Sequence, residues 1–157
     1  MMDASTPPTF ELRPATEADF GFARQLYLSS MQPLLTALDA WDPAEIECAF
    51  RGYFIPDEIK FVTMDGRDVG WFQVSQTRTE LCLDQLHLVE EVRGQGIGTA
   101  LINRIIDEAE AQGRNVSLSL VKGNQAQALY RRLGFRRRSE DDTKIHMRFV
   151  TGADADA

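Results

Sequence analysis

The stretch LCLDQLHLVEEVRGQGIGTALI, residues 81–102, changes its hydrophobic pattern halfway along. Apolar residues alternate at period two across residues 81–88, which is typical of a strand with one buried face. After an arginine and three glycines, Ile97, Leu101 and Ile105 recur at helical spacing. The stretch therefore predicts a strand, a tight glycine turn and a helix, in that order.

The glycine turn has the features of an anion-binding site. The first turn of a helix carries backbone N–H groups without partners, and the positive end of the helix dipole lies there. Glycine at positions 94, 96 and 98 removes the side chains that would hold a phosphate at a distance. We expect a phosphate group to bind at this turn.

Two common phosphate-binding motifs do not match the turn. The dinucleotide-binding pattern G-x-G-x-x-G, started at Gly94, requires a glycine where Thr99 stands. It also requires an acidic residue about 20 positions later, where residues 116–118 offer none. The nucleotide-binding loop G-x-x-x-x-G-K-[ST] requires a lysine that the turn lacks. The turn therefore belongs to another class of phosphate site.

A third pattern does match. R-x-x-G-x-G at residues 93–98 resembles the pyrophosphate-binding signature of the GNAT (Gcn5-related N-acetyltransferase) family. N-x-A-x-x-L-Y-x-x-x-G-F at residues 124–135 resembles a second motif of the same family, and a predicted helix and strand separate the two. The resemblance is strongest over residues 80–138. Elsewhere it rests on the sequence LRPAT at residues 12–16 and on the order of the predicted elements.

The resemblance implies a binding site for acetyl-CoA. The pantetheine arm is expected to lie as an extra strand along the strand before the turn, where the Leu88 N–H would polarise the thioester carbonyl. The turn itself would hold the pyrophosphate. The implied cofactor-binding residues are Leu86, His87, Leu88, Arg93, Gly94, Gln95, Gly96, Ile97, Gly98, Thr99, Asn124 and Tyr130.

The resemblance also implies two catalytic residues. Tyr130 would protonate the departing thiolate, since a phenol with a pKa near 10 carries its proton at neutral pH. Asp84, four residues before Leu88, would accept the proton that an ammonium must lose before it attacks. Glu80 and a water molecule are the alternatives, and a bulge in this strand would turn Gln85 toward the acceptor instead.

The implied function is that of an acetyl-CoA-dependent N-acetyltransferase in which a primary amine attacks the thioester directly. We expect a cationic acceptor, either a small amine or a protein lysine or N-terminus, because residues 1–92 contain 16 acidic and 6 basic residues, a net charge of −10. Residues 93–157 contain 8 acidic and 11 basic residues, a net charge of +3. The alternative is a non-catalytic acyl-CoA-binding or regulatory domain of the same fold. The length of the acyl chain and a homodimer are left open.

Composition excludes several other classes. The net charge of −7 argues against a nucleic-acid-binding surface. No apolar run approaches the roughly 18 residues that cross a membrane, and the first residues lack the pattern of a secretion signal, so we expect a cytoplasmic protein. Cys48 and Cys82 are expected to be reduced and to lie in the core, and no metal site is expected.

The order of predicted elements indicates an α+β fold. We expect a mixed, mostly antiparallel central sheet with helices on both faces, splayed at the cofactor-binding strand. A single N-acetyltransferase domain is expected over residues 10–150, between flexible tails at residues 1–9 and 151–157. Predicted strands cover residues 10–13, 59–64, 69–76, 80–89, 116–121, 135–138 and 144–150, and predicted helices cover 16–35, 43–54, 97–112 and 124–133.

Three aromatic residues lie in the region that, by the same resemblance, walls the acceptor site. They are Trp41, Tyr53 and Phe54. Aromatic side chains are more often buried than exposed, so a place in the core is the favoured interpretation.

Overall fold

A computed structural model describes residues 9–152 of the chain, and its centre is a seven-stranded sheet in the order β1-β2-β3-β4-β5-β7-β6. Only β4 and β5 pair in parallel; the other pairs are antiparallel. The predicted mixed α+β fold is thereby confirmed. The strands are β1 (Glu11–Pro14), β2 (Ile59–Met64), β3 (Arg67–Gln76), β4 (Glu80–Leu88), β5 (Asn115–Val121), β6 (Arg136–Glu140) and β7 (Lys144–Phe149), and the helices are α1 (Phe20–Ala37), α2 (Pro43–Tyr53), α3 (Ile97–Gln112) and α4 (Ala126–Leu133).

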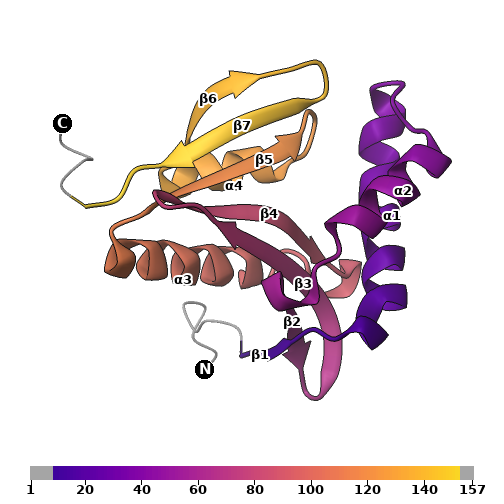
Figure 1. The fold of residues 1–157 in the computed structure, drawn as a ribbon, viewed down its shortest axis with the longest axis horizontal. Coiled ribbons are helices and arrows are strands. Elements are labelled where there is room, and N and C mark those ends of the chain that lie inside the picture. Colours follow the sequence, from indigo (N-terminus) through magenta and orange to yellow (C-terminus); the bar gives the residue numbers. More distant parts are fainter. Residues whose placement is uncertain (1–8, 153–157) are drawn as a thin grey trace, which may run out of the picture.

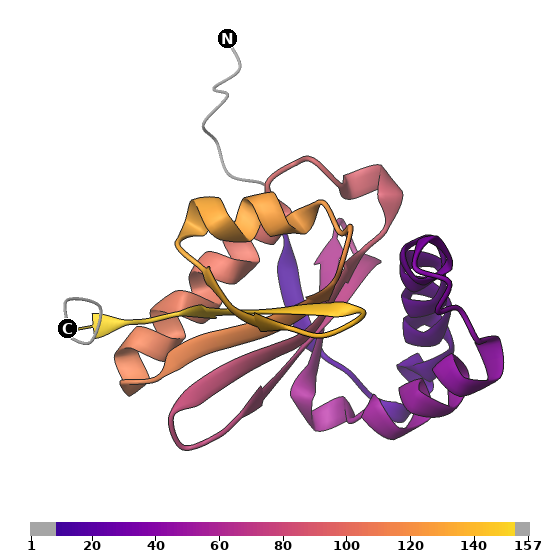
Figure 2. The same cartoon turned by 90° about the horizontal axis from the view of Figure 1, so that it is seen from above.

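Helices cover both faces of the sheet, as expected. Helices α1 and α2 pack on one face, over β2 to β4, around a core that includes Phe50, Phe61 and Trp71 (Figures 1 and 2). Helices α3 and α4 pack on the other face, around a larger core that includes Leu101 and Met147. The α1–α2 pair leaves the β5, β7 and β6 part of its face without a helix.

The sheet splits between its two central strands. Strands β4 and β5 pair only from Glu80 to Leu83 and from Asn115 to Leu118. Beyond these residues β4 continues along β3, and β5 continues along β7 (Figure 2). The predicted splay is therefore present, and within residues 9–152 it leaves one edge of β4 without a neighbouring strand. We call this point the fork.

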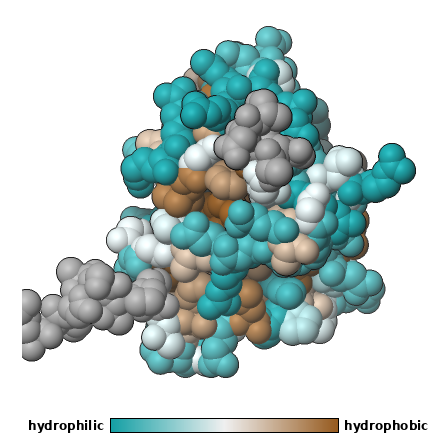
Figure 3. Space-filling model, turned by 90° about the vertical axis from the view of Figure 1, so that its left-hand side faces the viewer, coloured by the Kyte–Doolittle hydropathy of each residue, from teal (hydrophilic) through white to brown (hydrophobic). Residues whose placement is uncertain are grey.

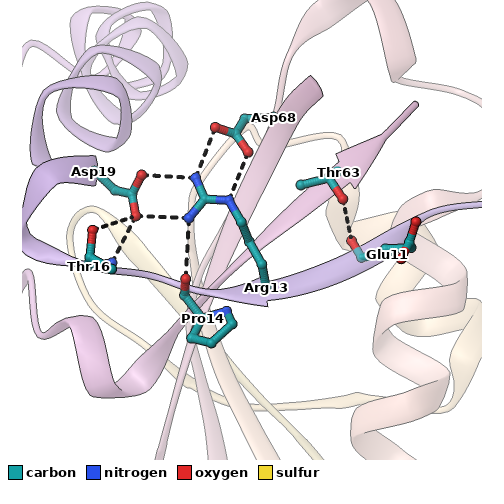
Figure 4. A network of polar contacts seen from close by, with 7 residues as sticks. All are labelled: Glu11, Arg13, Pro14, Thr16, Asp19, Thr63 and Asp68. Carbon is teal, nitrogen blue, oxygen red and sulfur yellow. Dashed lines mark hydrogen bonds and ion pairs between the residues drawn. The ribbon is translucent and has the colours of Figure 1, made fainter. Parts of the chain in front are cut away.

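An arginine ties the start of the chain to the sheet. The Arg13 guanidinium donates hydrogen bonds to both carboxylate oxygens of Asp19 and of Asp68, and it lies 4.5 Å from the centre of the Phe61 ring (Figure 4). Asp19 in turn accepts a bond from the Thr16 N–H, as in a capping box. These bonds fix α1 against β1 and β3, which holds that helix over its face of the sheet.

Most helix and strand boundaries predicted from the sequence lie within two residues of those in the structure. The Asp65-Gly66 turn has positive φ at both residues, as a tight hairpin requires. Gly113 closes α3 in the left-handed conformation, and Asp42 caps α2 by accepting a bond from the Glu45 N–H. The predicted C-terminal tail, residues 151–157, differs from the structure at its first residue. Thr151 is buried and bonded to Asn115 and Arg114, while most of the two predicted tails lies outside the described residues.

The expectation that both cysteines lie in the core is wrong for Cys48. This residue is exposed on α2, because the apolar side of that helix is formed by Ile46 and Phe50, and Cys48 lies between them on the opposite side. Cys82 is partly buried and accepts a hydrogen bond from Ser117.

The side of the molecule seen in Figure 3 is mostly hydrophilic. Figure 3 views one end of the molecule and shows hydrophobic residues in a recess between hydrophilic outer layers. Over residues 9–152, no helix combines the length and the hydropathy that a membrane crossing needs.

Candidate functional site

The glycine turn presents a row of unbonded backbone donors. Gly94 and Gly96 have φ of +77° and +87°, conformations that favour glycine. Within the described part of the chain, the N–H groups of residues 94–99 have no acceptor; the bonded neighbours are the N–H groups of Arg93 and Ala100. Helix α3 begins at Ile97, so its positive end points at the same place. The turn can therefore receive a diphosphate.

The Arg93 side chain joins this turn to the end of β4. Its Nε donates a 3.0 Å hydrogen bond to the Leu88 carbonyl oxygen. A short 3₁₀ turn, Glu90–Val92, lies between the two residues and is closed by bonds from the Val92 and Arg93 N–H groups. The turn and the free edge of β4 are thus held in one fixed arrangement.

The free edge of β4 offers the backbone groups of Leu86 and Leu88. The Val89 N–H bonds to the Val69 carbonyl, and bonded pairs alternate along an antiparallel ladder. His87 is therefore in a bonded pair with Trp71, whereas Leu86 and Leu88 point their N–H and C=O groups away from β3. The bond from Arg93 to the Leu88 carbonyl agrees with this direction. An extended arm can add to this edge as a further strand.

His87 is built into the core under α1. Its ring lies 5.0 Å from Trp71 and 5.5 Å from Tyr27, and its Nε2 is 2.7 Å from the Gln85 side-chain oxygen. Burial, with a smaller contribution from the positive charge of Arg93, lowers the pKa of His87 to about 3. Its backbone is bonded to β3 and its side chain is packed, so among the predicted cofactor-binding residues His87 offers no free group.

A bulge in β4 decides which way Asp84 points. Gln73 pairs with Gln85 and Val74 pairs with Leu83, so Asp84 is the extra residue between them. Leu83 and Leu86 consequently both face the α3 core, and Asp84 and Gln85 both line a cavity on the opposite face of the sheet. Regular alternation, which would have put Asp84 with Leu86, does not apply here.

Asp84 is held by a neighbour on β3. Its carboxylate accepts a 2.6 Å hydrogen bond from the Ser75 hydroxyl. The pKa of Asp84 is raised above its ordinary value, chiefly because the carboxylate is partly withdrawn from water; the Ser75 bond opposes this rise and the negative charge of Glu58 adds to it. A carboxylate with a raised pKa is a stronger proton acceptor than an ordinary one.

Glu80, the alternative base, is already paired. Its Oε2 atom lies 2.9 Å from Arg148 and 3.9 Å from Arg138. Two cations engage its carboxylate, so it is less free to receive a proton from an acceptor than Asp84 is.

The cavity beside Asp84 has a volume of about 670 Å³, within the range of small-molecule sites. It lies on the face that α1 and α2 leave uncovered, and six elements and the loop after α2 contribute to it. Tyr53, half exposed, is one of its walls rather than part of the core. Its lining also includes Ile55, Glu58, Gln73, Ser75, Glu80, Cys82, Leu83, Asp84, Gln85, Ser117, Leu118, Ser119, Arg138, Ser139, Lys144, His146 and Met147.

Tyr130 lies on the other side of the sheet, with the free edge of β4. Its ring packs against Phe135 at 5.8 Å, in the same core against which Leu86 and Leu88 pack. Burial raises the pKa of Tyr130 to about 12, so the phenol keeps its proton at neutral pH. Among residues 9–152 its hydroxyl has no hydrogen-bond partner, yet it is not one of the fully enclosed polar atoms. It is therefore free to donate a proton.

Asn124 acts as a cap at the start of α4. Its side-chain oxygen accepts a 2.9 Å bond from the N–H of Ala126, the first residue of the helix, whose N-cap is Gln125. Its amide nitrogen has no acceptor in the part of the chain that the structure describes, so it can donate to a ligand.

Four polar residues of β5 and β7 that line the cavity were not predicted from the sequence. Ser117 and Ser119 alternate with buried apolar residues on β5, and Lys144 and His146 do so on β7. Polar residues at period two on two neighbouring strands indicate a sheet face without a covering helix. That signal was present in the sequence, although it does not tell which helix is missing.

Comparisons with known proteins identify the family and the fold. The model of the acetyltransferase (GNAT) domain family matches residues 56–137, just over half of the chain. No curated protein sequence matches. The fold is shared with the PaiA N-acetyltransferase of Thermoplasma acidophilum in complex with coenzyme A (15% identity, covering 92% of this chain and 100% of that chain, TM-score 0.71).

Two further solved structures are similar. One is Ard1 of Thermoplasma volcanium (20% identity, covering 91% of this chain and 99% of that chain, TM-score 0.66). The other is the ribosomal-protein-S18-alanine N-acetyltransferase of Escherichia coli (19% identity, covering 92% of this chain and 97% of that chain, TM-score 0.65). With the family match over the glycine turn and the shared fold, the chain belongs to the GNAT acetyltransferase family.

Proposed function

We propose that the chain is an N-acetyltransferase that transfers the acetyl group of acetyl-CoA to a primary amine. As a member of the family, it takes acetyl-CoA as its co-substrate. The observation that carries the proposal is the fork between β4 and β5: the free edge of β4 and the unbonded turn at residues 94–99 lie on one side of it, and a cavity with the Asp84 carboxylate opens on the other. Two reactants can meet there from opposite faces of the sheet.

The bound co-substrate would supply a thioester, and the chain's own groups would do the rest. The N–H groups of the turn and Asn124 hold the cofactor, the edge of β4 aligns the arm, and the Leu88 N–H stabilises negative charge on the thioester oxygen. Asp84, directly or through water, takes a proton from the ammonium, and Tyr130 gives one to the sulfur. A C–N bond forms and a C–S bond breaks, so an ammonium and acetyl-CoA yield an amide, free CoA and one proton.

The proposed acceptor carries an ammonium group. Glu58 and Asp84 both line the cavity, and over residues 9–152 neither is paired with a cation. Two uncompensated carboxylates in a cavity attract a positive group. The reaction should therefore slow as salt screens these charges.

The test is an assay of CoA release with acetyl-CoA and a panel of amines. CoA release that requires an amine, with an acetylated product of matching mass, supports the proposal. A protein that is stabilised against heat by CoA but acetylates no amine would instead be a non-catalytic acyl-CoA-binding domain. A thermal shift with NADH but not with CoA would rule out the cofactor site itself.

A further inference from the structure

The uncovered half of the sheet face is basic. Along β7, Ile145 and Met147 are buried in the α3 core, so Lys144, His146 and Arg148 point to the opposite face. Arg138 lies in a bulge of β6, next to Ser139, and lines the cavity with Lys144 and His146. This wall faces the side of the cavity that carries Asp84 and Glu58.

The cations of this wall outnumber their partners. Arg138 and Arg148 share a single carboxylate, that of Glu80. Lys144 forms no ion pair within the described residues. Within the described residues, the charge of Lys144 is therefore not compensated, and the single Glu80 carboxylate compensates only one of the two arginine charges.

Other polar groups beside these cations also suit an anion. Ser119 lies on β5 directly after the last residue paired with β4, and its hydroxyl is 2.7 Å from the His146 Nδ1. The His146 Nε2 is 3.2 Å from the Asp141 carboxylate, so one acidic group is already engaged on the outer side of the wall. Hydroxyl groups beside a lysine and an arginine are typical donors to carboxylates and phosphates.

The cavity therefore has two poles: acidic carboxylates on the β3 and β4 side and, on the β6 and β7 side, cations that outnumber their carboxylate partners among residues 9–152. We propose that the acceptor is a small amine that also carries an anionic group, with its ammonium at Asp84 and Glu58 and its anion at Lys144 and Arg138. The inference rests on the proposed acetyl transfer and names its substrate class. The shared chemistry is a negative group on the amine, of which a carboxylate and a phosphate are the two sources.

The experiment compares kcat/KM for matched pairs of amines: α- and ω-amino acids against their amides, and phosphoethanolamine against ethanolamine. The expected result is a preference of about tenfold or more for the anionic member of a pair, the size of one charge-assisted hydrogen bond. The carboxylate and phosphate arms tell which anion the wall prefers. A neutral member used as well as its anionic partner, or a lysine peptide acetylated faster than every small amine, would overturn the inference.

Two variants connect the preference to the wall. Lys144→Gln and Arg138→Gln should each reduce kcat/KM for the anionic amine by about tenfold and leave its neutral partner within about twofold. Lys60→Gln is the control, because Lys60 is exposed on β2 and does not line this cavity; it lines a second cavity against α3 that shares Glu58 and Ser75 with the first. Unchanged CoA affinity shows that the variants are folded.

Variants that slow both members equally would contradict the inference. The two levels fail differently: amines acetylated without regard to their anion overturn only the substrate class, whereas CoA binding without acetylation of any amine overturns the proposed function and this inference together.

Discussion

The two sides of the fork are built in different ways. On the cofactor side, one continuous segment, residues 93–99, supplies the turn, and its unbonded N–H groups follow from glycine positions and a helix start. On the acceptor side, the cavity takes side chains from α2 and five strands that are distant in sequence. The first side is therefore a local motif and the second is a product of the whole fold. A change on one side should therefore leave the other side intact.

The largest effect is expected from Gly96→Val, on the cofactor side. Gly96 has φ +87°, and a branched side chain there would be strained and would fill the phosphate site. CoA affinity should fall about 100-fold, the value of two charge-assisted hydrogen bonds, in a calorimetric titration. Gly113→Val is the matched control: it has φ +68° and no atom within 4 Å of an added Cβ. It should lower Tm and keep CoA affinity, and equal affinity losses in the two variants would mean that strain, not the anion site, is responsible.

Tyr130→Phe should lower kcat by about 100-fold with little change in CoA affinity, because it removes only the proposed acid. Steady-state rates with acetyl-CoA and the best amine measure this. Tyr27→Phe is the control, because Tyr27 is also buried but lies in the core on the acceptor side. If Tyr130→Phe keeps the wild-type rate, its hydroxyl has no part in the reaction.

Asp84→Asn should lower kcat/KM about tenfold at neutral pH and recover at high pH, where the free amine is already deprotonated. In the wild type the rate should fall on acidification at a pH above the ordinary Asp pKa of 3.8, because the folded protein raises the pKa of Asp84. Asp107→Asn, on the exposed side of α3, is the control.

The thermal stability of the Asp84→Asn variant gives a second test of the raised Asp84 pKa. A raised pKa means that the folded state holds the Asp84 proton more tightly than the unfolded state, so ionisation at neutral pH costs stability. Asp84→Asn should therefore keep or raise Tm at pH 7. Wild-type rates across the whole pH range would transfer the role to Glu80 or to water.

The smallest effect is expected from Ser75→Ala. The Ser75 bond lowers the pKa of Asp84, so its removal should move the acidic limb of the rate profile to higher pH and reduce the neutral rate by about threefold. Ser117→Ala, which removes a hydroxyl bonded to Cys82 in the same cavity, should leave the profile in place. Equal profiles for both variants would show that the Ser75 bond does not tune Asp84.

The sequence predicted the fold and the cofactor side more completely than the acceptor side. Strand alternation, the Asp65-Gly66 turn and the closing glycine at Gly113 depend on neighbours in the chain, and the structure agrees with them. The glycine turn is equally local. In contrast, the direction of Asp84 depends on one extra residue in the ladder with β3, which alternation alone does not reveal.

The charge of the acceptor cavity could not be predicted from the net charge of residues 1–92. The prediction treated residues 1–92 as the acceptor wall, but Arg138, Lys144 and His146 from the basic half also line the cavity. They lie there because β7 pairs with β5, and the paired residues, from Val121–Lys144 to Val116–Phe149, are 23 to 33 positions apart in the sequence. Pairings of this kind are set by the packing of the entire sheet.

The most direct test of the two-sided fork is a crystal structure with acetyl-CoA bound. In that structure the diphosphate should lie on the N–H groups of residues 94–99, the thioester carbonyl at the Leu88 N–H, and the acetyl group at the fork, open to the cavity that carries Asp84. A diphosphate bound elsewhere, for example in the cavity of about 440 Å³ between α3 and β3, with residues 94–99 unbonded, would contradict this prediction.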